Sequence, residues 1–497
     1  MTAATQWDRP DLPRAVPHRV ASPVLVGRRK EMAWLGEALT RVDGGSPAAL
    51  LIGGDAGVGK SRLVSEFGAA APAVRVLTGK CPELGTIGLP FAPLRAILRD
   101  LVRDRGFADM IGSPDRELIR LLPELGQPAA TGTFREARAR LFVETLSLLE
   151  QLGRQQPTVL VIEDAQWADE STRELLYFLI DNQDAMRGVL IIVTYRSCEL
   201  HRGHPFCALL PRLSRLGWVQ RTELAGLDRD ESAELVGHLL DGAPGLPLAE
   251  RVYRRAEGIP LLIEELVGAD RERSWAGTAT TYDLMLAAIR RLPEPTQDVL
   301  RVASIGGQRT GRGLLAAVTG LSADALEASV RPALERGVLE AHEDYFAFRH
   351  ALISEALHQD LLPGEHTSTH QRFAAALRED SSLVPAGCAA IEEAEHWQHA
   401  HDPARALGSA WRAAADAGLA LARAEQLAML TRVLELWESV PDAKRLTGAD
   451  HALVLRQAAD VATAAGERQL AIALASAAQD ETVGHAAPGR AARPLRN

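Results

Sequence analysis

The sequence predicts an α/β fold with a doubly wound parallel sheet, because short apolar runs alternate with segments whose apolar residues recur at helical spacing. Unbroken apolar runs are typical of strands that are buried on both faces of a parallel sheet. They occupy residues 48–52, 74–77, 158–162, 189–194 and 218–224. The interval 82–156 is long for one connection between strands, so we expect a helical insertion there. The sheet domain as a whole is predicted to span 23–225.

Beyond residue 224 the strand pattern fades and helical patterns follow. We expect a helical lid over 226–280, where Gly258-Ile259-Pro260 separates two helices. Residues 281–365 contain helices, a turn at Gly337 and a short extended pair, which is the pattern of a winged helix.

The last region, 366–485, is rich in alanine and helical in pattern. Turns at 402–403, 439–441 and Gly466 favour TPR-like helical repeats, which need about three units to bury their faces. The two ends, 1–22 and 486–497, are expected to be flexible tails.

Composition narrows the classes of function. The chain of 497 residues is too long for one core, and its net charge of −10 argues against a surface that generally coats DNA or binds anionic membranes. Its four cysteines have no CxxC spacing, which excludes a disulfide scaffold and a cysteine zinc site and fits a reducing cytoplasm. No apolar run approaches the roughly 18 residues of a membrane span, so we expect a soluble, cytoplasmic protein.

Residues 54–61, GDAGVGKS, match the phosphate-binding pattern GxxxxGK[ST] in full. Gly54, Gly57 and Gly59 allow the backbone to turn its N–H groups towards phosphate oxygens. Lys60 would reach the β- and γ-phosphates, and the Ser61 hydroxyl would ligate Mg²⁺. A buried strand comes before the loop and a helix follows it, so the context agrees with ATP or ADP as the ligand.

A second part of the predicted site lies at the ends of two other strands. Glu163 and Asp164 follow the apolar run 158–162, and either acid could face the metal. Because successive strand residues point to opposite sides, one acid is expected at Mg²⁺ and the other at the γ-phosphate or the attacking water. Arg196 ends the next strand, where it could sense the γ-phosphate or could be an ordinary surface arginine.

The chain resembles the signal-transduction ATPases of the STAND class from about residue 25 to at least 440. The closest likeness is to the large ATP-binding LuxR-type transcriptional regulators of actinobacteria. Five segments carry it, in the order GGDAGVGKSRL, VIEDAQWADEST, IVTYRS, RAEGIPLLIEEL and FRHALISEALHQDLLP. The phosphate loop is generic, whereas the second and fifth segments are much more specific.

The resemblance implies a role for each matching residue. Glu163 would hold the metal with Ser61, Asp164 would polarise the water, and Arg196 would be the first sensor. The implied nucleotide contacts are Val26, Gly27 and Arg28 on the adenine side, Gly54, Asp55, Ala56, Gly57, Val58, Gly59, Lys60, Ser61 and Arg62 at the phosphates, Gly258 and Pro260 in the lid, and His350 near the β-phosphate. A helix-start histidine that caps its own helix is the alternative for His350.

The chain departs from the family pattern in two places. Ile259 stands where the family usually has asparagine. The family's repeats normally end in a LuxR-type helix-turn-helix, and no segment after 366 has the pattern of a basic recognition helix.

These patterns favour an ATP/ADP-driven signal-transduction switch with slow Mg²⁺-dependent hydrolysis. The expected partners are the nucleotide and either further copies of the chain or a protein or small-molecule inducer at the repeats. Direct transcription regulation through DNA rests mainly on the resemblance. The remaining alternative is an active AAA-type ATPase coupled to a mechanical or chaperone task.

Overall fold

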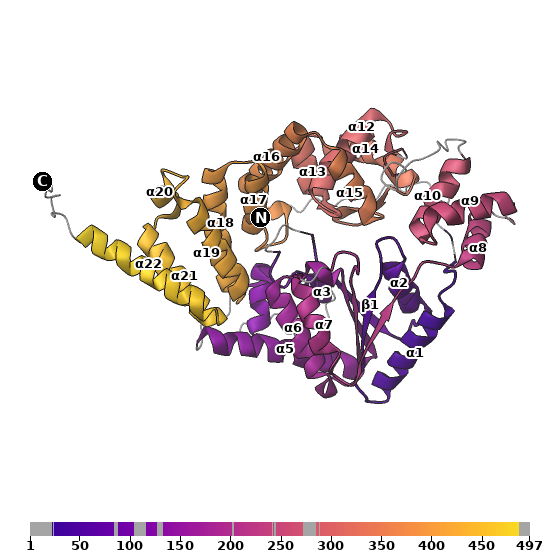
Figure 1. The fold of residues 1–497 in the computed structure, drawn as a ribbon, viewed down its shortest axis with the longest axis horizontal. Coiled ribbons are helices and arrows are strands. Elements are labelled where there is room, and N and C mark those ends of the chain that lie inside the picture. The colour runs from indigo at the N-terminus through magenta and orange to yellow at the C-terminus, as the bar shows by residue number, and fades with distance from the viewer. Residues whose placement is uncertain are drawn as a thin grey trace, which may run out of the picture.

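The computed structural model describes residues 22, 24–83, 88–103, 116–126, 133–200, 203–240, 242, 245–271, 285–287 and 289–486. Apart from Ser22 and Ala486, the predicted tails lie outside the described residues. A sheet domain forms the lower part of the molecule in Figure 1, and helical units lie above it.

Five parallel strands form the large sheet, which confirms the fold predicted from the apolar runs. They are β1 (Ala49–Gly53), β2 (Arg75–Lys80), β3 (Thr158–Glu163), β4 (Val189–Thr194) and β5 (Val219–Glu223). Their order is β2-β3-β4-β1-β5, so β4 lies between β1 and β3. The carboxyl ends of parallel strands meet at one edge, and β4 is therefore central to any site formed there.

The sheet is the middle of three layers, because alternate strand residues point to opposite faces. Leu50 and Ile52 pack in one core cluster, whereas Ala49 and Leu51 pack in the other. The first face is covered by α1 (Arg29–Asp43) and α2 (Lys60–Ala70); the second by α3 (Ala92–Arg103), α5 (Phe134–Gln155), α6 (Glu170–Asp181) and α7 (Pro205–Leu213).

The predicted insertion is helical where it is described. It contains α3, two short 3₁₀ helices (Glu117–Leu121 and Pro123–Leu125) and α5. Thr133 and Glu136 form a reciprocal capping box that fixes the start of α5.

The lid and the next unit share one hydrophobic core, in which Leu266 of the lid packs with Leu300 and Leu357 of the next unit. The segment predicted as a lid contains α8 (Arg229–Leu240), α9 (Leu246–Ala256) and α10 (Pro260–Arg271), and the name lid is kept for these helices. The next unit is α12 (Glu294–Ile305), β6 (Arg309–Gly311), α13 (Arg312–Thr319), α14 (Ala323–Glu335), β7 (Leu339–Ala341), β8 (Tyr345–Phe348) and α15 (Ala351–Asp360).

A small antiparallel sheet organises the unit that follows the lid. Its order is β6-β8-β7, and Thr310 of β6 pairs with Phe346 of β8. The sequence predicts the β7–β8 pair but not β6, since a three-residue strand leaves no periodic pattern.

The remaining helices pack successively along the chain (Figure 1). They are α16 (Pro363–Glu379), α17 (Ala389–His399), α18 (Pro403–Leu419), α19 (Arg423–Trp437), α20 (Ala443–Thr447), α21 (His451–Ala465) and α22 (Arg468–Ala486). All three predicted turns fall between helices, and Gly466 takes φ +87°. Among the described helices no single one could cross a membrane by length and hydropathy; α13 and α14, bent by 105°, pass that test only as a pair.

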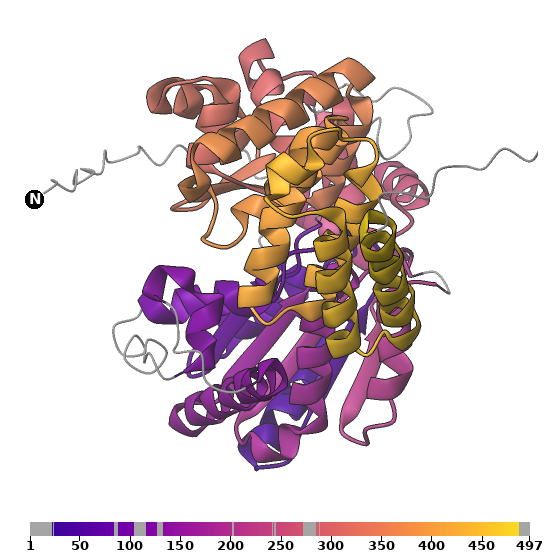
Figure 2. The same cartoon turned by 90° about the vertical axis from the view of Figure 1, so that its left-hand side faces the viewer.

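One further turn, between α18 and α19, has no glycine or proline to mark it. Leu421 takes φ +60° there, although its side chain is buried with Ala417 and Ala422 in the core of the sheet domain. Such backbone strain costs about 1–2 kcal/mol, and burial of the leucine offsets a similar amount. As a result helix α19 packs against α6 of the sheet domain, and Figures 1 and 2 show α19 beside this side of the domain.

Polar contacts also hold the later helices against the sheet domain. The carboxylate of Glu425 on α19 accepts hydrogen bonds from the backbone N–H and hydroxyl of Ser171, at 3.1 and 2.6 Å. Arg95 of α3 donates to the carbonyl of Gly387, at 3.3 Å. Two sequence segments more than 250 residues apart are therefore joined at the first turn of α6.

Candidate nucleotide-binding site

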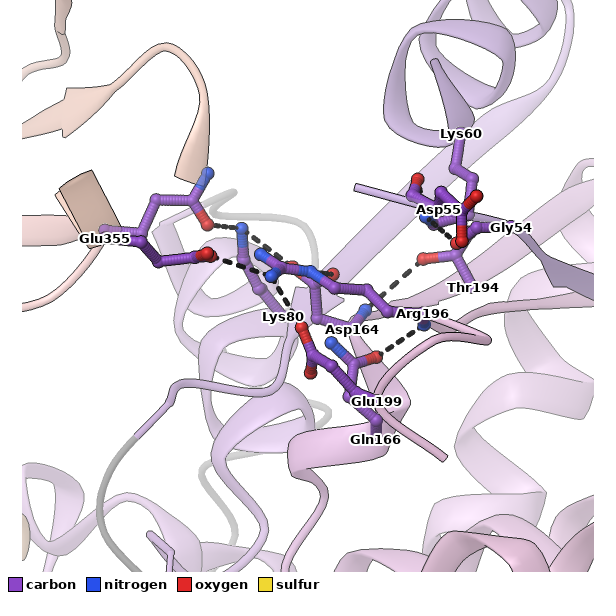
Figure 3. Close-up of polar contacts among 11 residues, drawn as sticks. Gly54, Asp55, Lys60, Lys80, Asp164, Gln166, Thr194, Arg196, Glu199 and Glu355 are labelled. Atoms are coloured by element: carbon purple, nitrogen blue, oxygen red, sulfur yellow. Dashed lines mark hydrogen bonds and ion pairs between the residues drawn. The ribbon is translucent and has the colours of Figure 1, made fainter. Parts of the chain in front are cut away.

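The loop between β1 and α2 has the backbone that phosphate binding requires. Gly54, Gly57 and Gly59 take φ of +146°, +78° and +101°, a region that side-chain-bearing residues rarely enter. Lys60 begins α2, and its ammonium donates to the carbonyls of Gly54 at 2.7 Å and Asp55 at 2.9 Å (Figure 3). Burial lowers the pKa of Lys60, and Asp164 opposes that effect.

The predicted adenine-side segment braces this loop. Arg28 is buried and donates from Nη2 to the carbonyls of Val58, at 3.1 Å, and Ala225, at 2.7 Å. Val26 belongs to the core of the lid. Residues 26–28 therefore connect the phosphate loop to the lid. Within and just after the loop, Asp55 and Ser61 are exposed, and Ala56 and Arg62 are half-buried.

The lid reaches the phosphate loop through the start of α10. The backbone N–H of Leu261 lies 3.4 Å from the carbonyl of Gly57, and Pro260 is the first residue of the helix. Gly258 takes φ +76°, and a Cβ there would lie 2.1 Å from the carbonyl oxygen of Leu227. Only glycine fits at this position. Ile259 packs against the lid core.

Glu163 and Asp164 lie in different environments, although they are adjacent in sequence. Glu163 ends β3 with 8% of its surface exposed, and its carboxylate has no hydrogen bond or ion pair within the described residues. Asp164 lies beyond the strand at φ +54° and forms an ion pair with Lys80 at 2.9 Å. Burial raises the pKa of Asp164, but Lys80 and Arg196 outweigh it and hold that pKa below its usual value.

The Ser61–Glu163 donor set fits Mg²⁺. Hard cations take oxygen ligands, and this pair offers a hydroxyl at the start of α2 and a buried carboxylate that has no partner in the described part of the chain. When bound, Mg²⁺ would be held by Ser61 and Glu163 and would neutralise phosphate charge.

Arg196 lies at the end of β4 in a cluster of acids (Figure 3). Its Nη1 donates to Glu199 at 2.6 Å and to Glu355 at 2.7 Å, and its Nε lies 4.0 Å from Asp164. Burial lowers the pKa of Arg196, but Glu355 and the other acids raise it above its usual value. The guanidinium also stacks 4.6 Å from the ring centroid of Trp167.

Glu355 belongs to α15, so this ion pair joins the sheet domain to the unit beyond the lid. Lys80 makes a parallel connection, because its ammonium also contacts the side-chain oxygen of Gln308. Sequence reasoning missed Glu355, Lys80 and Gln308. The only signal for Glu355 was its place in the FRHALISEAL segment.

His350 precedes α15, and its side chain makes no capping hydrogen bond, which removes the local-capping alternative. Burial, together with the charges of Arg349 and Arg62, lowers its pKa to about 3, so the imidazole is neutral. Arg62 of α2 also forms an ion pair with Glu264 of the lid at 3.4 Å. Arg62, on the helix that follows the phosphate loop, therefore lies near enough to His350 for its charge to act on the imidazole.

A model described as an AAA ATPase domain matches residues 24–193. The chain contains an AAA-type ATPase domain. The matched residues include the phosphate loop, Glu163 and Asp164, and the match ends just before Arg196.

A relative from Rhizobium meliloti (strain 1021), described as an uncharacterized protein, is 24% identical over 421 residues. That alignment covers 74% of this chain but only 38% of the relative.

Solved structures provide two comparisons. A Signal Transduction ATPase with Numerous Domains with a tetratricopeptide repeat sensor, from Pyrococcus horikoshii, has a TM-score of 0.52 and 15% identity, covering 94% of this chain and 66% of that one. This likeness shows the fold alone. A Walker-type ATPase of Pyrococcus abyssi covers 67% of this chain and 96% of its own at 18% identity, but its TM-score of 0.34 carries no argument.

Proposed function

We propose that this chain is a signal-transduction switch driven by ATP and ADP, with slow Mg²⁺-dependent hydrolysis, and that the described conformation is its closed form. The observation that carries the proposal is the ion pair between Arg196 and Glu355 at 2.7 Å. The arginine best placed to sense a γ-phosphate is bound by an acid from a different unit.

Arg196 cannot bind the γ-phosphate and keep its ion pair with Glu355 at the same time. A guanidinium that binds the γ-phosphate must release some of its carboxylate partners, because its donors point in fixed directions. A ligand moves a conformational equilibrium only by binding the two states differently. Contacts of the γ-phosphate with Lys60, Ser61 and Arg196 supply that difference, since ADP cannot make them.

The other site residues take complementary roles in this proposal. Val26, Gly27 and Arg28 face the adenine side, and Pro260 places the lid on the base. Neutral His350 donates a hydrogen bond near the β-phosphate. Glu163 holds Mg²⁺ with Ser61, and Asp164 polarises the attacking water once Lys80 moves away.

The units beyond the ATPase domain act as output and sensor. The helix-and-strand order of 281–365 supports a winged-helix domain, and the successive packing of α16–α22 supports TPR-like repeats. The repeats take the inducer or further copies of the chain. A role in transcription regulation, as in LuxR-type relatives, follows through such partners in the cytoplasm, with direct DNA contact a weaker alternative.

A working AAA-type ATPase is the second candidate. Glu163 favours it, because a buried carboxylate without a partner among the described residues is ready to hold metal for rapid turnover. The two candidates differ in rate, since a switch retains its nucleotide whereas a motor releases product continually.

The deciding experiment measures nucleotide released on denaturation together with steady-state turnover, for the wild type and Lys60→Ala. Retained ADP with very slow turnover, both lost in the variant, supports the switch. Fast turnover lost in the variant supports the working ATPase. A chain with neither nucleotide nor turnover, even with Mg²⁺ and ATP supplied, overturns both.

A further inference from the structure

Histidines gather where α15, α16 and α17 meet, well away from the phosphate loop. His366 and His370 lie four residues apart on α16, and His399 ends α17. Ring nitrogens of these three residues all lie within 4.8 Å of one another. His358 of α15 adds a fourth ring, with its Nε2 3.2 Å from Nε2 of His366.

The spacing of the nitrogens is that of ligands around one ion. Nitrogens at 2.0–2.1 Å from a tetrahedral ion lie about 3.3 Å apart. Nε2 of His366 and Nε2 of His370 are 3.3 Å apart. Residues four apart share one face of a helix, which is how paired histidines on a helix hold zinc.

A partner on the other ring nitrogen of His370 fixes the orientation that a metal ligand needs. Nδ1 of His370 lies 2.8 Å from Nδ1 of His396, which is buried and stacks on Phe373 at 4.9 Å between ring centroids. A metal-bound histidine ordinarily donates its second N–H to such a partner. His396 thus leaves Nε2 of His370 directed at His366.

Hydrogen bonding among neutral imidazoles is the alternative, and it accounts for His358, His366, His370 and His396 as a chain. It does not account for His399. That ring is exposed, stacks on His370 at 4.7 Å between centroids, and has no hydrogen bond within the described residues. An exposed third nitrogen also gives an ion a route into the cluster.

We propose that His366, His370 and His399 bind one divalent transition-metal ion, with zinc as the representative, and that His396 is a positioning residue for His370. Three neutral imidazoles favour zinc, copper or nickel over magnesium and calcium, which prefer oxygen ligands. The fourth position is open to water or to His358 after a rotation of its side chain.

Metal at this site cross-links α16 to α17. Helix α16 packs on α12 and α13 of the unit beyond the lid, whereas α17 packs on α18 of the repeats. An ion that binds the folded form raises its stability by mass action. The site would therefore tie the sensor region to the unit that holds Glu355, independently of nucleotide.

The test uses the full chain after removal of any histidine tag, without nucleotide. Co²⁺ is titrated and followed by visible absorption, and Zn²⁺ is then added in competition. The variants are His366→Gln and His399→Gln, with the exposed His342→Gln as the matched control. Circular dichroism of the metal-free proteins verifies that each variant is folded.

We expect one Co²⁺ per chain in the wild type and in the control, and affinity weakened by roughly 100-fold or more in the two ligand variants. Zn²⁺ should raise the thermal midpoint of the wild type but not of the variants. Lys60→Ala should titrate like the wild type, so failure of the nucleotide proposal would leave this result intact. Absence of one-to-one binding in the wild type, or wild-type affinity retained in His366→Gln or in His399→Gln, overturns the site.

Discussion

Arg196 and Glu355 form an ion pair of 2.7 Å across 159 residues of sequence, and it connects the end of β4 to α15. The Arg196 side chain is 6% exposed and that of Glu355 is 24% exposed, so solvent screens the pair only in part. The proposed switch therefore has a defined point at which closure can be weakened.

Glu355→Gln is expected to open the molecule. A hydrogen bond to a charged group contributes about 1.5–3 kcal/mol, which corresponds to roughly tenfold or more in a conformational equilibrium. Small-angle scattering should show a larger radius of gyration, and light scattering a larger share of oligomer with ATP. Glu327→Gln is the control, since its 2.5 Å pair with Arg312 lies within one unit. Equal radii for both variants would mean that the Arg196–Glu355 pair does not hold the closed form.

The two acids after β3 should respond differently to neutralisation. Glu163→Gln removes a buried charge that no described residue pairs with, so thermal stability should hold or rise while Mg²⁺-dependent turnover falls by about 100-fold or more. Asp164→Asn leaves Lys80 with a weaker partner, so for this variant the melting midpoint should fall together with the turnover. Differential scanning calorimetry and phosphate release measure the two effects. A lower melting midpoint for Glu163→Gln than for Asp164→Asn would mean that the metal-binding role belongs to Asp164 and the water-polarising role to Glu163.

Gly258→Ala should destabilise the lid. The substitution forces a side chain into φ +76° and places its Cβ 2.1 Å from a backbone oxygen. The strain alone costs about 1–2 kcal/mol, and the clash adds to it. Gly268→Ala is the control, because it lies in α10 with no atom within 4 Å of an added Cβ and should stabilise by about 0.5–1 kcal/mol. Urea unfolding measures the free energy of unfolding of both variants. The difference between the two variants should exceed the effect of either substitution alone.

Acid should destabilise the folded chain through His350. Its pKa is about 3 in the folded chain, below the ordinary histidine value. At pH values between these two pKa values the unfolded chain therefore binds more protons than the folded chain. The stability that this residue contributes is present above about pH 6.5 and is lost as pH falls towards 3, by at most about 1.4 kcal/mol per pH unit.

His350→Gln should therefore flatten the dependence of unfolding free energy on pH between 6.5 and 4. His238→Gln, at the surface of α8, serves as the control and should keep the wild-type slope. Parallel curves for His350→Gln and the wild type would show that the imidazole is not buried in its neutral form.

Local signals were sufficient for the core of the site. The spacing of Gly54, Gly57, Gly59 and Lys60 defines the phosphate loop, because each residue type meets a requirement of its own backbone or side chain. The alternation of apolar runs likewise predicts a parallel sheet. Gly258 and Pro260 mark the break between two lid helices for the same local reason.

Other features have no local signal. Glu355 and Lys80 look like ordinary surface charges in sequence, and Leu421 turns the chain without a glycine because its side chain is buried in the ATPase domain. The histidine spacing at 366 and 370 was visible in the sequence, but His399 joins it only through the packing of α17 on α16.

The sequence by itself determined the phosphate-loop pattern and the parallel sheet, since these depend on residues that are neighbours along the chain. Only the tertiary structure decided that Arg196 meets Glu355, that Asp164 binds Lys80 while Glu163 has no partner among the residues described, and that histidines from separate helices converge. Those relationships join residues far apart in sequence, and packing of separate units, rather than any local preference, brings them together.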